Sequence, residues 1–240
     1  MCHLNKYFIL FILLFILLLS ACLSRPKPLW VEPICYSTSQ QIAAIKTLSI
    51  KGKMKVSGFG YGFFGDLYLI ATTPSKLRAD IINPLGPLFS LTIAEDRFAL
   101  LIYPKGEVYL GNTEKLPINL RDWIYLLGQQ MWPIYTEHVV YAGDKKDAYY
   151  IKSFNYPTLE ELWLGKDTLK IKKIRIKNQE KRRIFEARFV YKNGQPELLK
   201  INLRGIKIEL TYLTINQNIE VKGPLFKLEY PEDVKKRYID

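Results

Sequence analysis

The sequence predicts a mainly β protein whose antiparallel strands form one strongly curved sheet, with one or two helices against its concave side. Short runs of alternating apolar and polar residues recur along most of the chain. Turn-forming residues separate these runs at intervals of about 8–12 residues, which is typical of barrels and sandwiches. Only two segments after the N-terminal region show helical spacing. A sheet of about ten to fourteen strands curls or closes rather than staying flat.

The first residues predict an export signal. Residues 7–19 form an apolar run, and Lys6 precedes it. The run is shorter than the roughly 20 residues that a membrane-spanning helix needs, and its layout is that of a secretory signal. The motif LSAC at 19–22 follows directly and resembles the bacterial lipobox, which implies cleavage before Cys22 and attachment of lipid to that residue. An ordinary cleaved signal with a chance cysteine is the alternative.

The chain is therefore divided into a lipoprotein signal peptide at 1–21, a lipidated N-terminus with an extended tether at 22–36, and a single β domain at 37–240. Three prolines between residues 26 and 33 predict the tether, because proline-rich segments are extended. The domain begins with Ser39–Leu48, in which the apolar residues follow helical spacing. We expect an amphipathic helix there.

The clearest strand patterns alternate apolar and polar residues over 75–82, 89–94, 183–191 and 205–211. Asn193-Gly194 follows the third of these and predicts a hairpin turn with positive φ. Weaker strand patterns complete the predicted sheet; they fall at 51–57, 66–73, 98–103, 107–110, 139–142, 148–154, 161–164, 169–177, 197–204 and 213–221.

A second helix is predicted at Asn119–Leu127, within the series of strands. Asn119 can cap its N-terminus and Gly128 can end it. Trp123 and Leu127 share one face of this helix, so we expect it to lie on an apolar surface.

The composition argues against catalysis. His3 and His138 are the two histidines, and His3 lies in the predicted signal, so a histidine-rich metal site or a Ser-His-Asp triad is not supported. Phosphate-loop, dinucleotide-binding and metalloprotease motifs are absent from the sequence. We predict a protein that is not an enzyme and that uses no metal and no cofactor. The alternative, an anchored enzyme, would need a polar cleft with clustered carboxylates.

The chain is basic, with 35 Lys+Arg against 23 Asp+Glu and a formal charge of +12. Nine of the basic residues lie in 166–183, beside two acids. This stretch predicts either a solvated outer face whose lysines protect an exposed sheet edge, or attraction to an anionic partner or membrane surface. Lys172-Lys173 breaks the alternation as a β-bulge would. Nucleic acid is not an expected partner, since an exported lipoprotein rarely meets it.

A tight loop is predicted between the strands at 75–82 and 89–94. Asn83-Pro84 starts a turn and Gly86 permits positive φ, which places Leu85 at the tip. Such a leucine is either an incidental surface residue or an apolar probe for a membrane or acyl chain. Its burial would contribute about 1.5–3 kcal/mol, which can bias a transfer but cannot anchor a protein.

Three features together resemble the outer-membrane lipoprotein receptor family, LolB, of the LolA/LolB-like group. They are the lipobox ending at Cys22, the strand–loop–strand around 83–86, and the segment NLRDWI at 119–124, which is similar to the family's Leu-Arg-x-Trp-Ile helix. The likeness covers roughly residues 40–135. It implies a half-open, strongly curved antiparallel β-barrel with a short helical lid over an apolar cavity.

The resemblance also implies a function. The family accepts acylated lipoproteins from a LolA-like periplasmic carrier and inserts them into the outer membrane, and its projecting loop leucine, matched here by Leu85, serves that insertion. It implies a monomer held in the outer membrane by N-terminal acyl chains and facing the periplasm. The alternative is a structural or regulatory envelope lipoprotein with the same fold that binds a protein partner instead of acyl chains.

Inward positions of the strands and helices are the candidates for lining an acyl-chain cavity, although the same residues would equally form an ordinary core. They are Phe89, Leu91, Ile93, Leu100, Trp123, Leu127, Phe185 and Phe189.

Overall fold

The computed structural model describes residues 28–58, 61–115, 120–221 and 223–239. The predicted lipidation site Cys22 and N-cap Asn119 lie outside these residues. Short 3-10 turns join some strands at Tyr103–Lys105, Thr113–Lys115, Thr136–His138 and Gly223–Phe226. The strands are β1 (Thr47–Gly58), β2 (Tyr61–Thr72), β3 (Lys76–Asn83), β4 (Gly86–Ala94), β5 (Arg97–Ile102), β6 (Glu107–Asn112), β7 (Val139–Asp144), β8 (Ala148–Asn155), β9 (Thr158–Gly165), β10 (Ile171–Lys177), β11 (Arg183–Lys192), β12 (Gln195–Leu203), β13 (Ile206–Gln217) and β14 (Lys235–Ile239).

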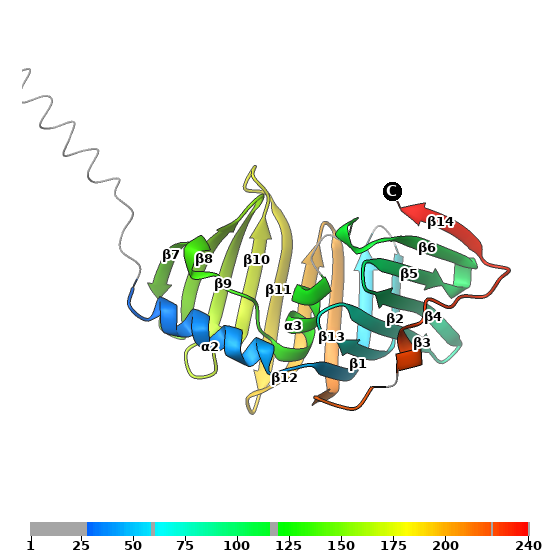
Figure 1. Cartoon of the computed structure of the whole chain (residues 1–240), viewed down its shortest axis with the longest axis horizontal. Coiled ribbons are helices and arrows are strands. Elements are labelled where there is room, and N and C mark those ends of the chain that lie inside the picture. The colour runs from blue at the N-terminus through cyan, green and yellow to red at the C-terminus, as the bar shows by residue number, and fades with distance from the viewer. Residues whose placement is uncertain (1–27, 59–60, 116–119, 222, 240) are drawn as a thin grey trace, which may run out of the picture.

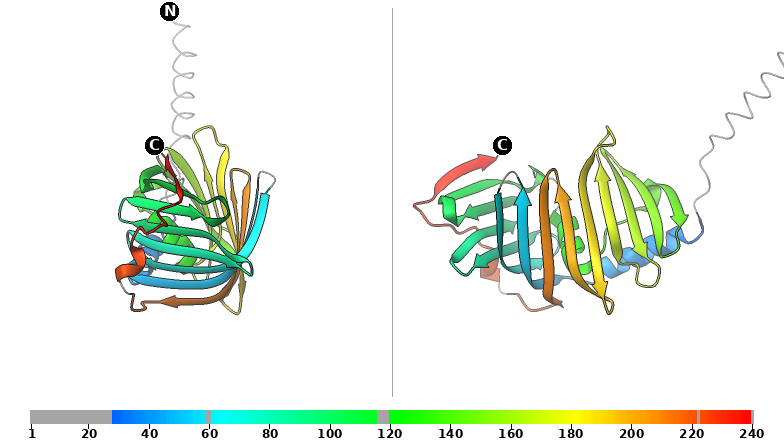
Figure 2. Two further views of the ribbon diagram at one scale, coloured as in Figure 1. Left: turned by 90° about the vertical axis from the view of Figure 1, so that its right-hand side faces the viewer. Right: turned by 180° about the vertical axis from the view of Figure 1, so that it is seen from behind.

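Over the described residues, these 14 strands form one curved, unclosed sheet (Figures 1 and 2). Its order is β14-β6-β5-β4-β3-β2-β1-β13-β12-β11-β10-β9-β8-β7, so β14 and β7 are the two edges. Neighbouring strands pair antiparallel, except that β14 runs parallel to β6. The helices α2 (Val31–Ala43) and α3 (Leu120–Gln129) lie on the same, concave side. The mainly β, half-open fold with short helices is therefore confirmed.

Strand alternation builds the core as the sequence predicts. Leu67, Leu69 and Ala71 of β2 are buried, whereas the neighbouring outward residues Asp66 and Tyr68 are exposed. The inward side chains of most strands join residues of α2 and α3 in one apolar cluster. Among the described residues, no helix is both long enough and apolar enough to span a membrane.

Strand boundaries differ from the prediction where bulges change the phase. The predicted strands 205–211 and 213–221 are one strand, β13, in which Leu213 is an extra residue between the pairs Gly52–Tyr212 and Lys51–Thr214. Because a bulge shifts the alternation by one residue, the sequence alone resembles two strands here. Lys172 is a second bulge, and this one was predicted: the register of β10 against β9 shifts between Ile171 and Lys173.

The first helix lies earlier than predicted. The segment 39–48 was expected to be helical, but α2 ends at Ala43 and β1 begins at Thr47. The extended tether expected at 22–36 is wrong from Val31 onward, where α2 begins and contributes to the core. Pro33 misled the prediction, since the first helical turn tolerates a proline because its N–H groups have no intrahelical acceptor. The buried stripe of α2 is Val31, Ile34, Cys35, Thr38 and Ile42, so the folded part begins before residue 37.

The second helix is confirmed, but Gly128 does not end it. Helix α3 continues to Gln129, and Gln130 adopts the positive φ of 54°. Gly128 is buried against Leu48 of β1, and an added Cβ would overlap the leucine methyl groups. The glycine therefore allows α3 to approach the sheet closely.

Candidate functional site

The inner face of the sheet opens along β4 toward the β3–β4 hairpin. Ile93, the inward residue farthest from the hairpin, is 1% exposed, and its partner Leu77 on β3 is also buried. The next inward residues, Leu91 and then Phe89, are half-buried, as is Ile81 opposite Phe89. Apolar surface therefore leads from the closed core toward the hairpin.

The hairpin has the geometry that its sequence predicts. The Leu85 N–H donates to Asn83 Oδ1 at 2.9 Å, and Gly86 has a φ of 129°. These local features close a two-residue turn whose second residue, Leu85, is 96% exposed. The leucine therefore projects into solvent at the end of the β3–β4 hairpin.

The eight cavity candidates divide into two groups. Ile93, Phe185 and Phe189 are buried in the main cluster, so they act as packing residues. Phe185 is also in edge-to-face contact with Trp123, at a ring-centroid distance of 5.6 Å. The candidates that retain exposed surface are the half-buried Phe89, Leu91, Leu100, Trp123 and Leu127.

Helix α3, the predicted lid, is hydrogen-bonded to the sheet at the C-terminal end of the helix. The Tyr212 hydroxyl donates to the Leu127 carbonyl at 2.9 Å, and Gln217 Nε2 donates to the Gly128 carbonyl at 3.3 Å. Both donors belong to β13, and burial raises the pKa of Tyr212. These bonds satisfy carbonyls that a helix end leaves without an intrahelical partner.

The basic stretch 166–183 lies on the outer face and is largely compensated. Burial alone would raise the pKa of Glu186, but hydrogen bonds from Arg175 and Arg188 and the charge of Lys173 lower it to about 2. The predicted solvated outer face is confirmed. The predicted exposed edge is wrong, because β10 lies between β9 and β11.

Glu160 and Glu161 are adjacent but face opposite sides of β9. Burial raises the pKa of Glu160, although its carboxylate accepts a hydrogen bond from Trp132 Nε1 at 3.0 Å. Burial would also raise the pKa of Glu161, but Lys177 and Arg175 lower it. Both carboxylates thus hold neighbouring elements together. Within the described part of the chain, no group of three or more His, Cys, Asp or Glu side chains could hold a metal ion.

A groove of about 430 Å³ lies on the outer face beside the hairpin, and the sequence analysis missed it. We call it the outer groove. Its apolar wall is Phe64, Ile82 and Pro84, with Phe64 69% and Ile82 40% exposed. Lys53 and Lys55 of β1 line the other side. Apolar residues at these outward positions break the alternation, which would have been the signal to look for.

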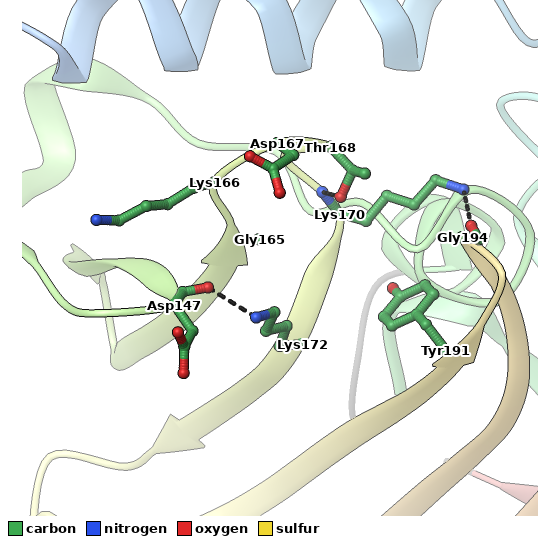
Figure 3. Close-up of a pocket in the computed structure, with 9 residues that line it drawn as sticks. All are labelled: Asp147, Gly165, Lys166, Asp167, Thr168, Lys170, Lys172, Tyr191 and Gly194. Atoms are coloured by element: carbon green, nitrogen blue, oxygen red, sulfur yellow. Dashed lines mark hydrogen bonds between the residues drawn. The ribbon is translucent and has the colours of Figure 1, made fainter.

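A smaller pocket of about 190 Å³ lies where the turns after β7, β9 and β11 meet (Figure 3). Lys166, Lys170 and Lys172 line it, but each ammonium group has a partner. Lys170 Nζ donates to the Gly194 carbonyl at 3.2 Å, Lys172 Nζ donates to the Asp147 carbonyl at 2.7 Å, and Lys166 is ion-paired to β7. These lysines therefore join the turns to one another.

Comparison with known proteins identifies the fold. No protein-family model and no curated protein matches the sequence. A domain described as an outer membrane lipoprotein-sorting protein, from Vibrio parahaemolyticus, aligns with a TM-score of 0.55 and 9% identity over 81% of this chain and 94% of its own. A DUF1329 family protein from Desulfovibrio piger aligns with a TM-score of 0.56 and 9% identity, over 85% of this chain and 98% of its own.

A LolA superfamily protein from Nitrosomonas europaea aligns with a TM-score of 0.51 and 9% identity, over 80% of this chain and 97% of that one. In each case the similarity extends over nearly the whole neighbour. At this level of identity it concerns the arrangement of the backbone. The chain thus has the LolA/LolB-like fold.

Proposed function

We propose that this protein is an outer-membrane lipoprotein, anchored through Cys22 and facing the periplasm, that accepts acylated lipoproteins from a LolA-like carrier and inserts them into the outer membrane. The observation that carries the proposal is the pair of half-buried apolar residues Leu91 and Phe89 on the inner face, together with the exposed Leu85 at the tip of the hairpin that follows. The fold shared with a lipoprotein-sorting domain supports it.

The physical reason for such a surface is the cost of moving acyl chains through water. Each exposed CH₂ group costs about 0.8 kcal/mol, so a carrier and its receptor both need a covered apolar face. Exchange between two such faces is nearly isoenergetic, and the bilayer then accepts the chains. This exchange needs no catalytic group, no metal and no cofactor from the protein.

A structural or regulatory lipoprotein that binds a protein partner is the second candidate. The edge strand β7 favours this second candidate. In the described part of the chain, β7 pairs only with β8, so its other edge has no partner strand, and its residues Val140 and Tyr141 are exposed. Unpaired edge strands of this kind can accept an extended peptide.

Cargo transfer distinguishes the two candidates. A soluble chain that lacks residues 1–21 and carries Cys22→Ala is mixed with a carrier from the same organism, loaded with an acylated lipoprotein, and the cargo that moves is measured. Transfer supports the proposal. No transfer to the folded protein favours the protein-binding alternative.

The tip is tested with Leu85→Glu in the anchored protein. Because the side chain is exposed, we expect unchanged folding and cargo acceptance but impaired delivery to the membrane, as measured by cargo recovered in vesicles. Val190→Glu is the matched control, since Val190 is also an exposed apolar residue, 45% accessible, but lies on β11. Normal delivery by Leu85→Glu would contradict the assigned role.

A further inference from the structure

The outer groove combines exposed apolar side chains with two lysines of β1. Its apolar wall of Phe64, Ile82 and Pro84 continues directly into the Leu85 turn. Large apolar residues usually face the core of a sheet, so this exposed group is a candidate interaction surface. Strand pairing fixes the group, because β2 and β3 are hydrogen-bonded neighbours and Ile82 lies opposite Asp66.

The groove is lined by two lysines and two carboxylates, and further lysines lie beside it. Outward positions of the two strands next to it hold Lys51, Lys53 and Lys55 on β1 and Lys207 on β13. Among the described residues, neither Lys53 nor Lys55 forms an ion pair. Two carboxylates also line the groove. Asp66 lies opposite Lys53 in the strand register, and Glu209 lies opposite Lys55 and is paired with Lys200 at 3.7 Å.

We propose that the outer groove docks on an anionic bilayer surface, with Phe64 and Ile82 against the acyl region and Lys53 and Lys55 against lipid phosphates. Lysines beside an anionic membrane are attracted to it, and their ammonium groups can remain at headgroup level while apolar neighbours enter deeper. The net charge of +12 favours the same partner.

Docking through this surface would give the hairpin a fixed orientation. A lone leucine at a turn could touch the bilayer at many angles, whereas a groove beside it allows few. This inference deepens the proposed function. Binding of the groove to a bilayer does not depend on that function, but the reason for binding does, since docking would place the end of the inner apolar face at the membrane.

The test places a fluorescent probe in the groove of the full, lipid-anchored chain. Phe64→Cys is labelled with a thiol-reactive bimane, and the protein is reconstituted into vesicles containing nitroxide-labelled phospholipid. The native Cys35 is buried and is not expected to react. Val190→Cys is the matched control, because Val190 is 45% exposed on the outward side of β11, away from the groove. Circular dichroism checks that both variants are folded.

We expect strong quenching at position 64 and little at 190. Replacing part of a phosphatidylcholine vesicle with phosphatidylglycerol should increase the quenching at 64 by about twofold or more, and Lys53→Gln with Lys55→Gln should remove that increase. Quenching at 64 no greater than at 190 would overturn the proposal, and so would quenching that ignores lipid charge and both lysines.

Cargo transfer measured on the same preparations separates this inference from the proposed function. Quenching at 64 without transfer leaves the docking surface in place and removes the lipoprotein-receptor function. Transfer without quenching at 64 supports the receptor function and refutes docking through the outer groove.

Discussion

Protonation of Glu186 should destabilise the outer face of the sheet. Its side chain is 7% exposed and accepts hydrogen bonds from Arg175 Nε at 2.9 Å and Arg188 Nε at 2.8 Å, with Lys173 Nζ at 3.6 Å. A pKa lowered from 4.5 to about 2 corresponds to roughly 3 kcal/mol of stability at neutral pH. Solvent around Arg188 screens part of this, so we expect about 1–3 kcal/mol.

The direction of the pH dependence follows from the lowered pKa. The folded chain binds the Glu186 proton more weakly than the unfolded chain, so the stabilisation is present above pH 4.5 and is lost as the pH falls toward 2. Glu186→Gln removes this contribution. The difference in unfolding free energy between wild type and variant should therefore be largest near pH 7 and should narrow in acid.

Urea unfolding from pH 7 to pH 2.5 measures this difference. Glu209→Gln is the control, because Glu209 also pairs with a lysine, at 3.7 Å, but is half exposed. The control should change stability by less than about 1 kcal/mol. A Glu186→Gln effect of the same size at every pH would refute the reasoning, because it would mean that packing, and not charge, had been lost.

Two further substitutions test packing and a buried hydrogen bond. Gly128→Ala should lower the unfolding free energy, measured in urea, by up to about 2 kcal/mol. Overlap with Leu48 costs about 1–3 kcal/mol, whereas the higher helix preference of alanine contributes about 1 kcal/mol in the opposite direction. Equal or greater stability would mean that α3 shifts freely. Trp132→Phe removes the 3.0 Å hydrogen bond to Glu160 and should cost about 1–3 kcal/mol at pH 7. That loss should shrink as the pH falls through the raised pKa of Glu160, where protonation favours the folded state. A pH-independent loss would assign the effect to the volume of the indole ring.

Most of the sheet could be predicted because its strands carry one apolar face each. Alternation identified β3, β4, β11 and the first half of β13, and the turn residues Asn193 and Gly194 both adopt the positive φ expected of them. Strand β14 gave no such signal. All five of its residues are exposed, and its place depends on backbone pairing with β6.

The candidate site was only partly predictable, for a related reason. The turn at Leu85 depends on neighbouring residues, so its place at the loop tip followed from the sequence, whereas its 96% exposure is known only from the structure. The outer groove depends on strand pairing between β2 and β3, which brings Phe64 and Ile82 together from separate strands. The adjacent residues Phe63 and Phe64 also look equivalent in the sequence. In the structure, Phe63 packs against Phe89 at a ring-centroid distance of 4.4 Å, whereas Phe64 faces solvent.

The half-buried apolar residues of the inner face, Phe89 and Leu91, help to distinguish a lipid-handling role from a purely structural one. Exposed apolar surface costs about 25 cal/mol per Å², and a protein that used this sheet only as a scaffold would gain stability by enclosing Phe89 and Leu91 as it encloses Ile93. The chain instead keeps these residues half-buried and carries a leucine that is 96% exposed at the neighbouring hairpin. A transient apolar ligand would offset this cost whenever it is bound, which is the behaviour that a receptor for acyl chains requires.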